Sequence, residues 1–200
     1  FQFHPPMIII GSAGSGKTVL MLEKLKQLTG NVAYISLSNY LVENARKMYY
    51  ANGYENEDSE VDFISFHHYL ESWQIPEGKE ITFRVFEQWF NRHAQHVKLN
   101  EPYRVYEEFK GVLTGSPLHT AFLSKEEYVS LGIKQSIFAA DKREQVYSLF
   151  IKYLQWMKEN NYYDSNMLSF DYLQLVQPRY DYIMIDEVQD ITGIQLKCIM

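Results

Sequence analysis

The 200-residue sequence is poor in cysteine and has no long apolar run. Its single cysteine, Cys198, excludes a disulfide framework or a thiolate metal site within the chain, and it suits a reducing compartment. No apolar run approaches the roughly 20 residues that a membrane helix needs, and we find no charged-then-apolar pattern of the secretory type. We therefore expect a soluble, cytoplasmic protein without a membrane partner.

Basic side chains are also scarce, because 19 lysines and arginines stand against 25 aspartates and glutamates, for a net charge of −6. This deficit argues against a protein whose whole surface clamps nucleic acid, since neutralising phosphates requires lysine and arginine. A local basic groove remains compatible with it. The apolar content of 46% is enough for a sizeable core, in one large domain or in one domain with an insertion.

A glycine-rich stretch, MIIIGSAGSGKTVLMLEKL at residues 7–25, fits the complete P-loop pattern. Glycines let the backbone turn its N–H groups toward a phosphate, and the following helix adds its positive end. Lys17 can reach the β- and γ-phosphates, and the Thr18 hydroxyl is a hard oxygen ligand for Mg²⁺. The apolar run at 7–10 predicts a buried strand in front of the loop. The predicted nucleotide-binding residues are Gly11, Ser12, Ala13, Gly14, Ser15, Gly16, Lys17 and Thr18.

The segment YIMIDEVQD at residues 182–190 predicts the partner of this loop. Asp186 follows four strand residues, so it should emerge at the carboxyl end of a strand, where open α/β sheets place their ligands. We expect Asp186 to share Mg²⁺ with Thr18, and Glu187 to polarise the water that attacks the γ-phosphate. We also expect the P-loop and Asp186 to follow adjacent strands of one parallel sheet.

The rest of the chain predicts an α/β protein with a helical insertion. Strand-like runs occur at 32–38 and 61–65, and a helix-like segment at about 40–50 lies between them. From about 73 to 170, apolar residues recur at helical spacing, which predicts a mostly helical lobe. The many aromatic residues of this segment are most simply explained as core.

Several motifs resemble those of superfamily 1 helicases of the UvrD/Rep/PcrA type. GSAGSGKT at 11–18 and DEVQD at 186–190 resemble motifs I and II, SFHHY at 65–69 resembles motif Ib, and SLSN at 36–39 occupies the place of motif Ia. The insertion falls where the family has its 1B subdomain, and its details resemble a divergent UvrD-like branch. The resemblance implies a P-loop NTPase (RecA-like) parallel sheet with three parts: a first part of the ATP-binding domain 1A at 1–72, a 1B-like helical insertion at 73–170, and a truncated continuation of the first domain at 171–200.

The resemblance also implies an ATP-dependent DNA helicase, which couples ATP hydrolysis to translocation on single-stranded nucleic acid and to duplex unwinding, as in DNA repair. It implies ATP and Mg²⁺ as cofactors, and catalytic roles for Lys17, Glu187 and Gln189. The family's motifs Ia and Ib imply nucleic-acid contacts at Ser38, Asn39, Phe66 and His67. The implied partners are single-stranded or partly duplex DNA, with RNA as the alternative, and a second RecA-like domain. The helicase motifs of that second domain do not occur here, so we expect the chain to be a fragment of a longer polypeptide.

The sequence departs from the family at motif Ia. The family usually has an aromatic residue and a lysine there, whereas this chain has Leu37 and Tyr40. A leucine cannot stack on a base as an aromatic ring does, but Tyr40 could take that role. The weakened motif and the acidic charge keep a second class open, a nucleotide-switched regulatory or signalling ATPase of helicase-like fold without unwinding activity. Stimulation of ATP hydrolysis by single-stranded DNA would distinguish the two classes.

Overall fold

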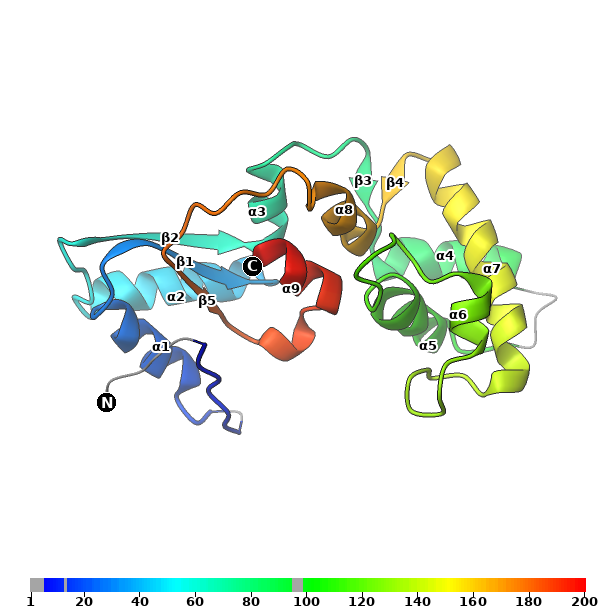
Figure 1. Ribbon diagram of the computed structural model, residues 1–200, viewed down its shortest axis with the longest axis horizontal. Coiled ribbons are helices and arrows are strands. Elements are labelled where there is room, and N and C mark those ends of the chain that lie inside the picture. The colour runs from blue at the N-terminus through cyan, green and yellow to red at the C-terminus, as the bar shows by residue number, and fades with distance from the viewer. Residues whose placement is uncertain (1–5, 13, 95–98) are drawn as a thin grey trace. The chain divides into compact units, whose positions relative to one another are not determined.

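The computed structural model describes residues 6–12, 14–94 and 99–200, and the chain divides into two compact units (Figure 1). Unit 1 comprises Phe1–Tyr69 and Pro178–Val188, and unit 2 comprises Leu70–Gln177 and Gln189–Met200. The last twelve residues therefore cluster with unit 2, whereas the family resemblance implies that they continue the first domain. The reason is that the C-terminal helix packs against the helix that ends at residue 172, which also belongs to unit 2.

Unit 1 is built around a parallel sheet with the strand order β2-β1-β5. Its strands are β1 (Gly30–Ser36), β2 (Ser59–Ser65) and β5 (Tyr182–Ile185). The central strand β1 is buried from its third residue to its end, as expected for a strand covered on both faces. The register pairs the last residue of β1 with the last residue of β2, and Ile35 with the last residue of β5. All three strands therefore end at the same edge of the sheet, and the prediction of an α/β fold with a parallel sheet is confirmed.

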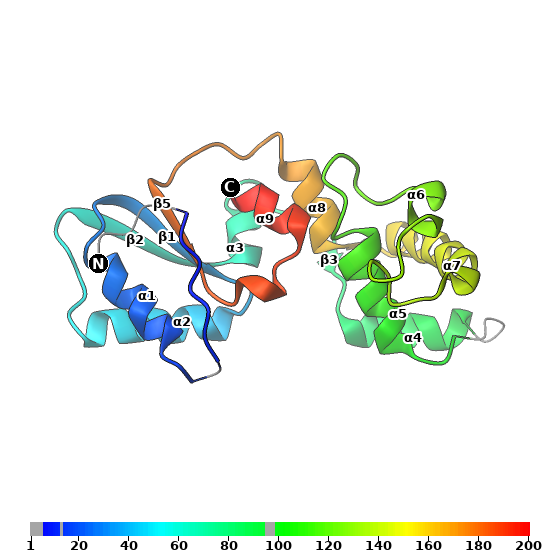
Figure 2. The same cartoon turned by 60° about the horizontal axis from the view of Figure 1, so that its bottom comes forward.

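Two helices cover the same face of this sheet (Figures 1 and 2). They are α1 (Lys17–Leu25) and α2 (Asn39–Ala51), and a third helix, α3 (Phe66–Glu71), directly follows β2. The Ser38 side chain begins α2, because its hydroxyl accepts a hydrogen bond from the Leu41 N–H at 3.4 Å. Side chains of α1, β1 and α2 form one buried core: Leu22, Leu25, Val32, Tyr34, Ala45 and Tyr49.

The strand predicted at residues 7–10 is not formed, and that prediction is wrong. Ile8 is 80% exposed and Ile10 is 92% exposed. A strand requires a neighbour that pairs with its backbone N–H and C=O groups, and within the described ranges β5 ends the sheet without such a pairing to 7–10. The prediction that the glycine-rich loop and Asp186 follow adjacent strands therefore fails as well. An apolar run indicates a tendency to be buried, but it does not supply the partner strand.

Unit 2 is mostly helical and contains a short parallel pair of strands. Its helices and helical turns are α4 (Phe83–His93), α5 (Pro102–Glu107), the π-helical turn η1 (Glu108–Leu113), α6 (Lys125–Val129), α7 (Ala140–Glu159), α8 (Ser165–Tyr172) and α9 (Gly193–Ile199). Its strands are β3 (Lys79–Glu80) and β4 (Tyr162–Tyr163). The 3-10 turn η2 (Val188–Asp190) connects β5 to the C-terminal part of the chain.

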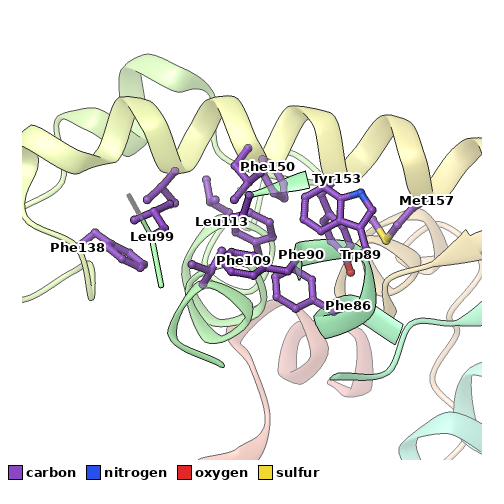
Figure 3. Close-up of a cluster of buried hydrophobic side chains, with 14 of the residues drawn as sticks. Phe86, Trp89, Phe90, Leu99, Phe109, Leu113, Phe138, Phe150, Tyr153 and Met157 are labelled. Atoms are coloured by element: carbon purple, nitrogen blue, oxygen red, sulfur yellow. The ribbon is translucent and has the colours of Figure 1, made fainter. Parts of the chain in front are cut away.

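The core of unit 2 is rich in aromatic side chains from α4, η1 and α7 (Figure 3). The ring centroid of Phe86 lies 5.7 Å from that of Phe109 and 5.2 Å from that of Tyr153, and both pairs meet edge to face. Such aromatic pairs contribute about 0.5 to 1.5 kcal/mol each beyond the burial of their surface. For these residues the prediction that helical spacing marks core positions is confirmed.

The longest helix, α7, is amphipathic over its 20 residues. Val146, Phe150, Tyr153 and Met157 are buried at helical spacing, while polar residues such as Lys152 and Gln155 are exposed between them. In the part of the chain that the structure describes, no helix has both the length and the apolar character to cross a membrane.

A buried carboxylate holds the segment in front of α7. Glu108, the first residue of η1, is fully buried and accepts hydrogen bonds from the Tyr128 hydroxyl at 2.7 Å and the Ile137 N–H at 2.9 Å. The Ser136 hydroxyl also donates to this carboxylate. The Arg143 guanidinium, which is buried as well, donates to backbone carbonyl groups of the same segment. Both charges are compensated by hydrogen bonds, as buried charges require.

Candidate nucleotide and metal site

The glycine-rich loop leads directly into helix α1. Gly14 and Gly16 have φ angles of 75° and 80°, in the left-handed region that a side chain disfavours, so glycine is needed at both positions. The Ser15 N–H donates to the Ser12 carbonyl at 3.2 Å and closes a turn within the loop. Helix α1 begins at Lys17, two residues after Ser15, so the positive end of the helix lies at the loop. Ala13, also predicted to bind nucleotide, lies outside the described residues.

Lys17 directs its ammonium group to the start of this loop. Its Nζ donates to the carbonyl oxygens of Gly11 and Ser12, each at 3.1 Å. The positive charge is therefore held over the loop backbone, where a bound phosphate would be placed by the P-loop pattern. The contact needs only the first turn of α1 and the loop itself, so the local sequence determines it.

Asp186 reaches the loop from the other end of the sequence. It follows β5, and its N–H donates to the Ile35 carbonyl at 2.9 Å, which continues the pairing of β5 with β1. The Thr18 hydroxyl donates to Asp186 Oδ2 at 3.0 Å. The Asp186 side chain is buried at this point. The structure thus brings together the two side chains that the sequence predicts to share a metal ion.

Tyr34, which sequence reasoning missed, contacts the same carboxylate. Its hydroxyl donates to Asp186 Oδ2 at 2.5 Å, while the Glu187 N–H donates to Oδ1 at 3.1 Å. Burial raises the pKa of Tyr34 above its ordinary value, and the hydrogen bond to Asp186 raises this pKa further. The phenol is therefore a neutral donor at physiological pH. A tyrosine hydroxyl in the buried part of a central strand needs a partner, and this was the only signal available in the sequence.

Glu187 has an unusual backbone conformation. Its φ angle is 53°, which is uncommon for a residue other than glycine. Such strained positions persist where the surrounding structure enforces them, and they cluster at functional sites. Glu187 is half-buried at the end of β5, in unit 1. Gln189, also predicted to be catalytic, is exposed in η2 and belongs to unit 2.

The oxygen donors of this site fit Mg²⁺ in combination with a nucleotide. Magnesium sites of this kind use one or two carboxylates and substrate phosphates, and the ion keeps several waters. Thr18 and Asp186 offer one hydroxyl and one carboxylate beside the glycine-rich loop. Among residues 6–12, 14–94 and 99–200, no group of three or more His, Cys, Asp or Glu side chains is placed to hold a metal. Metal binding here would therefore depend on phosphate oxygens.

The residues predicted to contact nucleic acid follow β1 and β2, at the sheet edge where all three strands end. Ser38 caps α2, Asn39 is exposed as the first residue of that helix, and His67 is half-buried in α3. Phe66 is different, because it is 2% exposed and its ring stacks on Tyr69 with centroids 6.3 Å apart. The structure therefore gives Phe66 a packing role, and its ring is not on the surface as a contact would require.

No protein-family model matches the chain, and no curated protein matches its sequence. One fold can carry many unrelated functions, so a functional assignment has to rest on the chemistry of the site.

Proposed function

We propose that this chain is the ATP-binding part of a UvrD-like superfamily 1 helicase, an ATPase motor that moves along single-stranded nucleic acid. The observation that carries the proposal is the 3.0 Å contact between Thr18 and Asp186, which joins the P-loop pattern to the DEVQD motif. Each pattern alone is a weak indication, because short motifs arise by chance. Their meeting in space is what a nucleotide-hydrolysing site requires.

Phosphate binding is the first role of the site. The loop backbone and the start of α1 supply N–H groups and a positive helix end, and the Lys17 ammonium adds a full charge. When bound at Thr18 and Asp186 together with the phosphates, Mg²⁺ would neutralise the charge on the phosphate oxygens. Thr18 and Asp186 hold their relative position through their own hydrogen bond.

Proton transfer is the second role, and we assign it to Glu187. Its carboxylate would accept the proton of the water that attacks the γ-phosphate. The left-handed backbone at this residue is of the strained kind that clusters at functional sites. Asp186 is buried beside Thr18, where the two side chains would hold Mg²⁺, whereas Glu187 is only half-buried.

Nucleic acid is proposed to bind at the edge where the strands end. Asn39 and His67 follow β1 and β2, and Tyr40, the second residue of α2, is 73% exposed. An exposed tyrosine is a platform on which a base can stack, whatever its identity. We therefore replace Phe66 by Tyr40 in the proposed contact set of Ser38, Asn39, Tyr40 and His67.

A second candidate function is a nucleotide-switched regulatory or signalling ATPase that does not unwind duplexes. Two observations favour this function. The burial of Phe66 removes one of the predicted nucleic-acid contacts, and the net charge of −6 weakens the attraction for phosphates. In this case nucleotide binding would still use Lys17, Thr18 and Asp186.

The decisive experiment measures ATP binding by the chain and ATP hydrolysis by the complete protein with and without single-stranded DNA. The motor proposal expects Mg²⁺-dependent binding and hydrolysis that DNA stimulates. Binding without any stimulation by DNA or RNA would favour the regulatory ATPase. Failure to bind ATP in the presence of Mg²⁺ would refute both.

A further inference from the structure

Tyr34 places a hydroxyl in the buried centre of the sheet. Its side chain is fully buried, and its ring packs beside Phe63 with centroids 5.4 Å apart. The neighbouring strand residues, Ala33 and Ile35, are apolar and buried. A phenylalanine would provide the same ring for this core, so the hydroxyl is the part of Tyr34 that requires an explanation.

The hydroxyl is one of three donors that surround the Asp186 carboxylate. Oδ2 accepts from the Thr18 hydroxyl at 3.0 Å and from Tyr34 at 2.5 Å, and Oδ1 accepts from the Glu187 N–H at 3.1 Å. The two oxygens of a carboxylate offer about four acceptor directions in total. With both oxygens engaged, the carboxylate plane cannot rotate without breaking hydrogen bonds in a buried environment.

Of these three donors, only Thr18 is itself a predicted metal ligand. The Glu187 N–H belongs to the backbone and follows from the turn after β5. Among the residues that the structure describes, Tyr34 is therefore the side chain that donates to this carboxylate without being a predicted metal ligand. Tyr34 lies in β1, which pairs with β5, and this pairing ends at Ile185, the residue before Asp186. The sheet therefore sets the position of Tyr34 relative to the carboxylate.

We propose that Tyr34 is a positioning residue for Asp186, and that its hydroxyl keeps the carboxylate in the orientation in which Thr18 and Asp186 take up Mg²⁺ with a nucleotide. This inference rests on the proposed nucleotide site. Groups that hydrogen-bond to a metal-binding carboxylate orient it, and their loss typically lowers metal affinity by about 10- to 100-fold. A purely structural role would instead lower thermal stability and leave the Mg²⁺ requirement of the folded protein unchanged.

The test compares Tyr34→Phe with Tyr153→Phe as the matched control. Tyr153 is also buried, and its hydroxyl has no hydrogen-bond partner among the described residues. Binding of a fluorescent, slowly hydrolysed ATP analogue is measured across a Mg²⁺ titration and in EDTA, with folding of each variant checked by circular dichroism. For Tyr34→Phe we expect the Mg²⁺ concentration at half-maximal binding to rise by roughly 10- to 100-fold while binding in EDTA is unchanged. Tyr153→Phe should change neither.

Two results would overturn the inference. If folded Tyr34→Phe needs no more Mg²⁺ than the unsubstituted chain, Tyr34 does not position the metal ligand, and the proposed nucleotide site stands. If the unsubstituted chain shows no Mg²⁺-dependent nucleotide binding, the proposed function fails and the inference fails with it.

A second measurement covers the case in which Tyr34→Phe does not fold. In the unsubstituted chain with labelled tyrosine, the ring resonances of Tyr34 should shift during a Mg²⁺ titration at saturating nucleotide, because its partner Asp186 binds the ion. The resonances of Tyr153 serve as the reference and should stay in place. A Tyr34 resonance that stays fixed while Mg²⁺ binds would also overturn the inference.

Discussion

Thr18 and Asp186 are 168 residues apart in the sequence, and a hydrogen bond of 3.0 Å joins their side chains. The contact arises because β5 pairs with β1, which carries Asp186 to the edge where the strands end, and because α1 begins directly after the glycine-rich loop. A hydroxyl and a carboxylate, two oxygen donors suited to Mg²⁺, thereby meet beside the loop that carries the P-loop pattern.

The first prediction separates nucleotide binding from hydrolysis. Lys17→Ala should weaken both, because the ammonium at the loop neutralises phosphate charge in the ground state and in the transition state. Glu187→Gln should leave ATP affinity near that of the unsubstituted protein and lower turnover by about 10²- to 10⁴-fold, the usual effect of losing a general base. ATP affinity and steady-state hydrolysis are measured in the complete protein at saturating single-stranded DNA.

The control for the lysine is Lys26→Ala, at the opposite end of α1, which should leave binding and hydrolysis unchanged. Hydrolysis by Glu187→Gln at the unsubstituted rate would mean that DEVQD is not the catalytic partner of GSAGSGKT.

The second prediction concerns nucleic-acid contact at the start of α2. Tyr40→Ala should weaken binding of single-stranded DNA by about 1 to 3 kcal/mol, since one stacked base is lost. Tyr50→Ala is the matched control, because Tyr50 is 52% exposed at the other end of the same helix. Affinities are measured by fluorescence polarisation with a labelled oligonucleotide. Equal affinities for the two variants would remove Tyr40 from the proposed contact set.

The third prediction concerns the stability of unit 2. Glu108→Ala should lower the free energy of unfolding by about 3 kcal/mol or more, because one buried donor and two partly buried donors lose their acceptor together. Glu107→Ala, at the exposed neighbouring position, should change it by less than about 0.5 kcal/mol. Urea denaturation followed by circular dichroism measures both. A small effect for Glu108→Ala would show that water replaces the carboxylate.

The fourth prediction is a loss of stability at alkaline pH. Burial and the hydrogen bond to the Asp62 carboxylate raise the pKa of Tyr180 to about 12, and burial raises the pKa of Tyr163 to about 12. The folded state thus holds these protons more tightly than the unfolded state, in which the pKa is about 10. Their contribution to stability is complete below pH 10 and is lost as the pH rises toward 12.

This is measured as the free energy of unfolding at several pH values between neutrality and pH 12, with tyrosinate absorbance recorded alongside. Tyr180→Phe should make the decline less steep. A stability that stays constant through this range would contradict the assigned pKa values.

Local sequence determined the parts of the site that depend on neighbours in the chain. The left-handed turns at Gly14 and Gly16 require glycine, and the helix that the P-loop pattern predicts after the loop begins at Lys17. The strands β1, β2 and β5 were also predicted, because runs of apolar and β-branched residues suit a buried parallel sheet. Since such strands end at one edge, the position of Asp186 at that edge followed from the sequence as well.

For other residues, only the tertiary structure decided which partners they meet. Ile8 and Ile10 are as apolar as the residues of a central strand, yet they are exposed. A strand needs a second strand to pair with, and composition cannot specify that partner. Phe66 occupies a motif position but packs in the core, while the hydroxyl of Tyr34 meets Asp186 across paired strands. A sequence pattern records what each residue prefers to contact, whereas the register of the sheet determines which residue it meets.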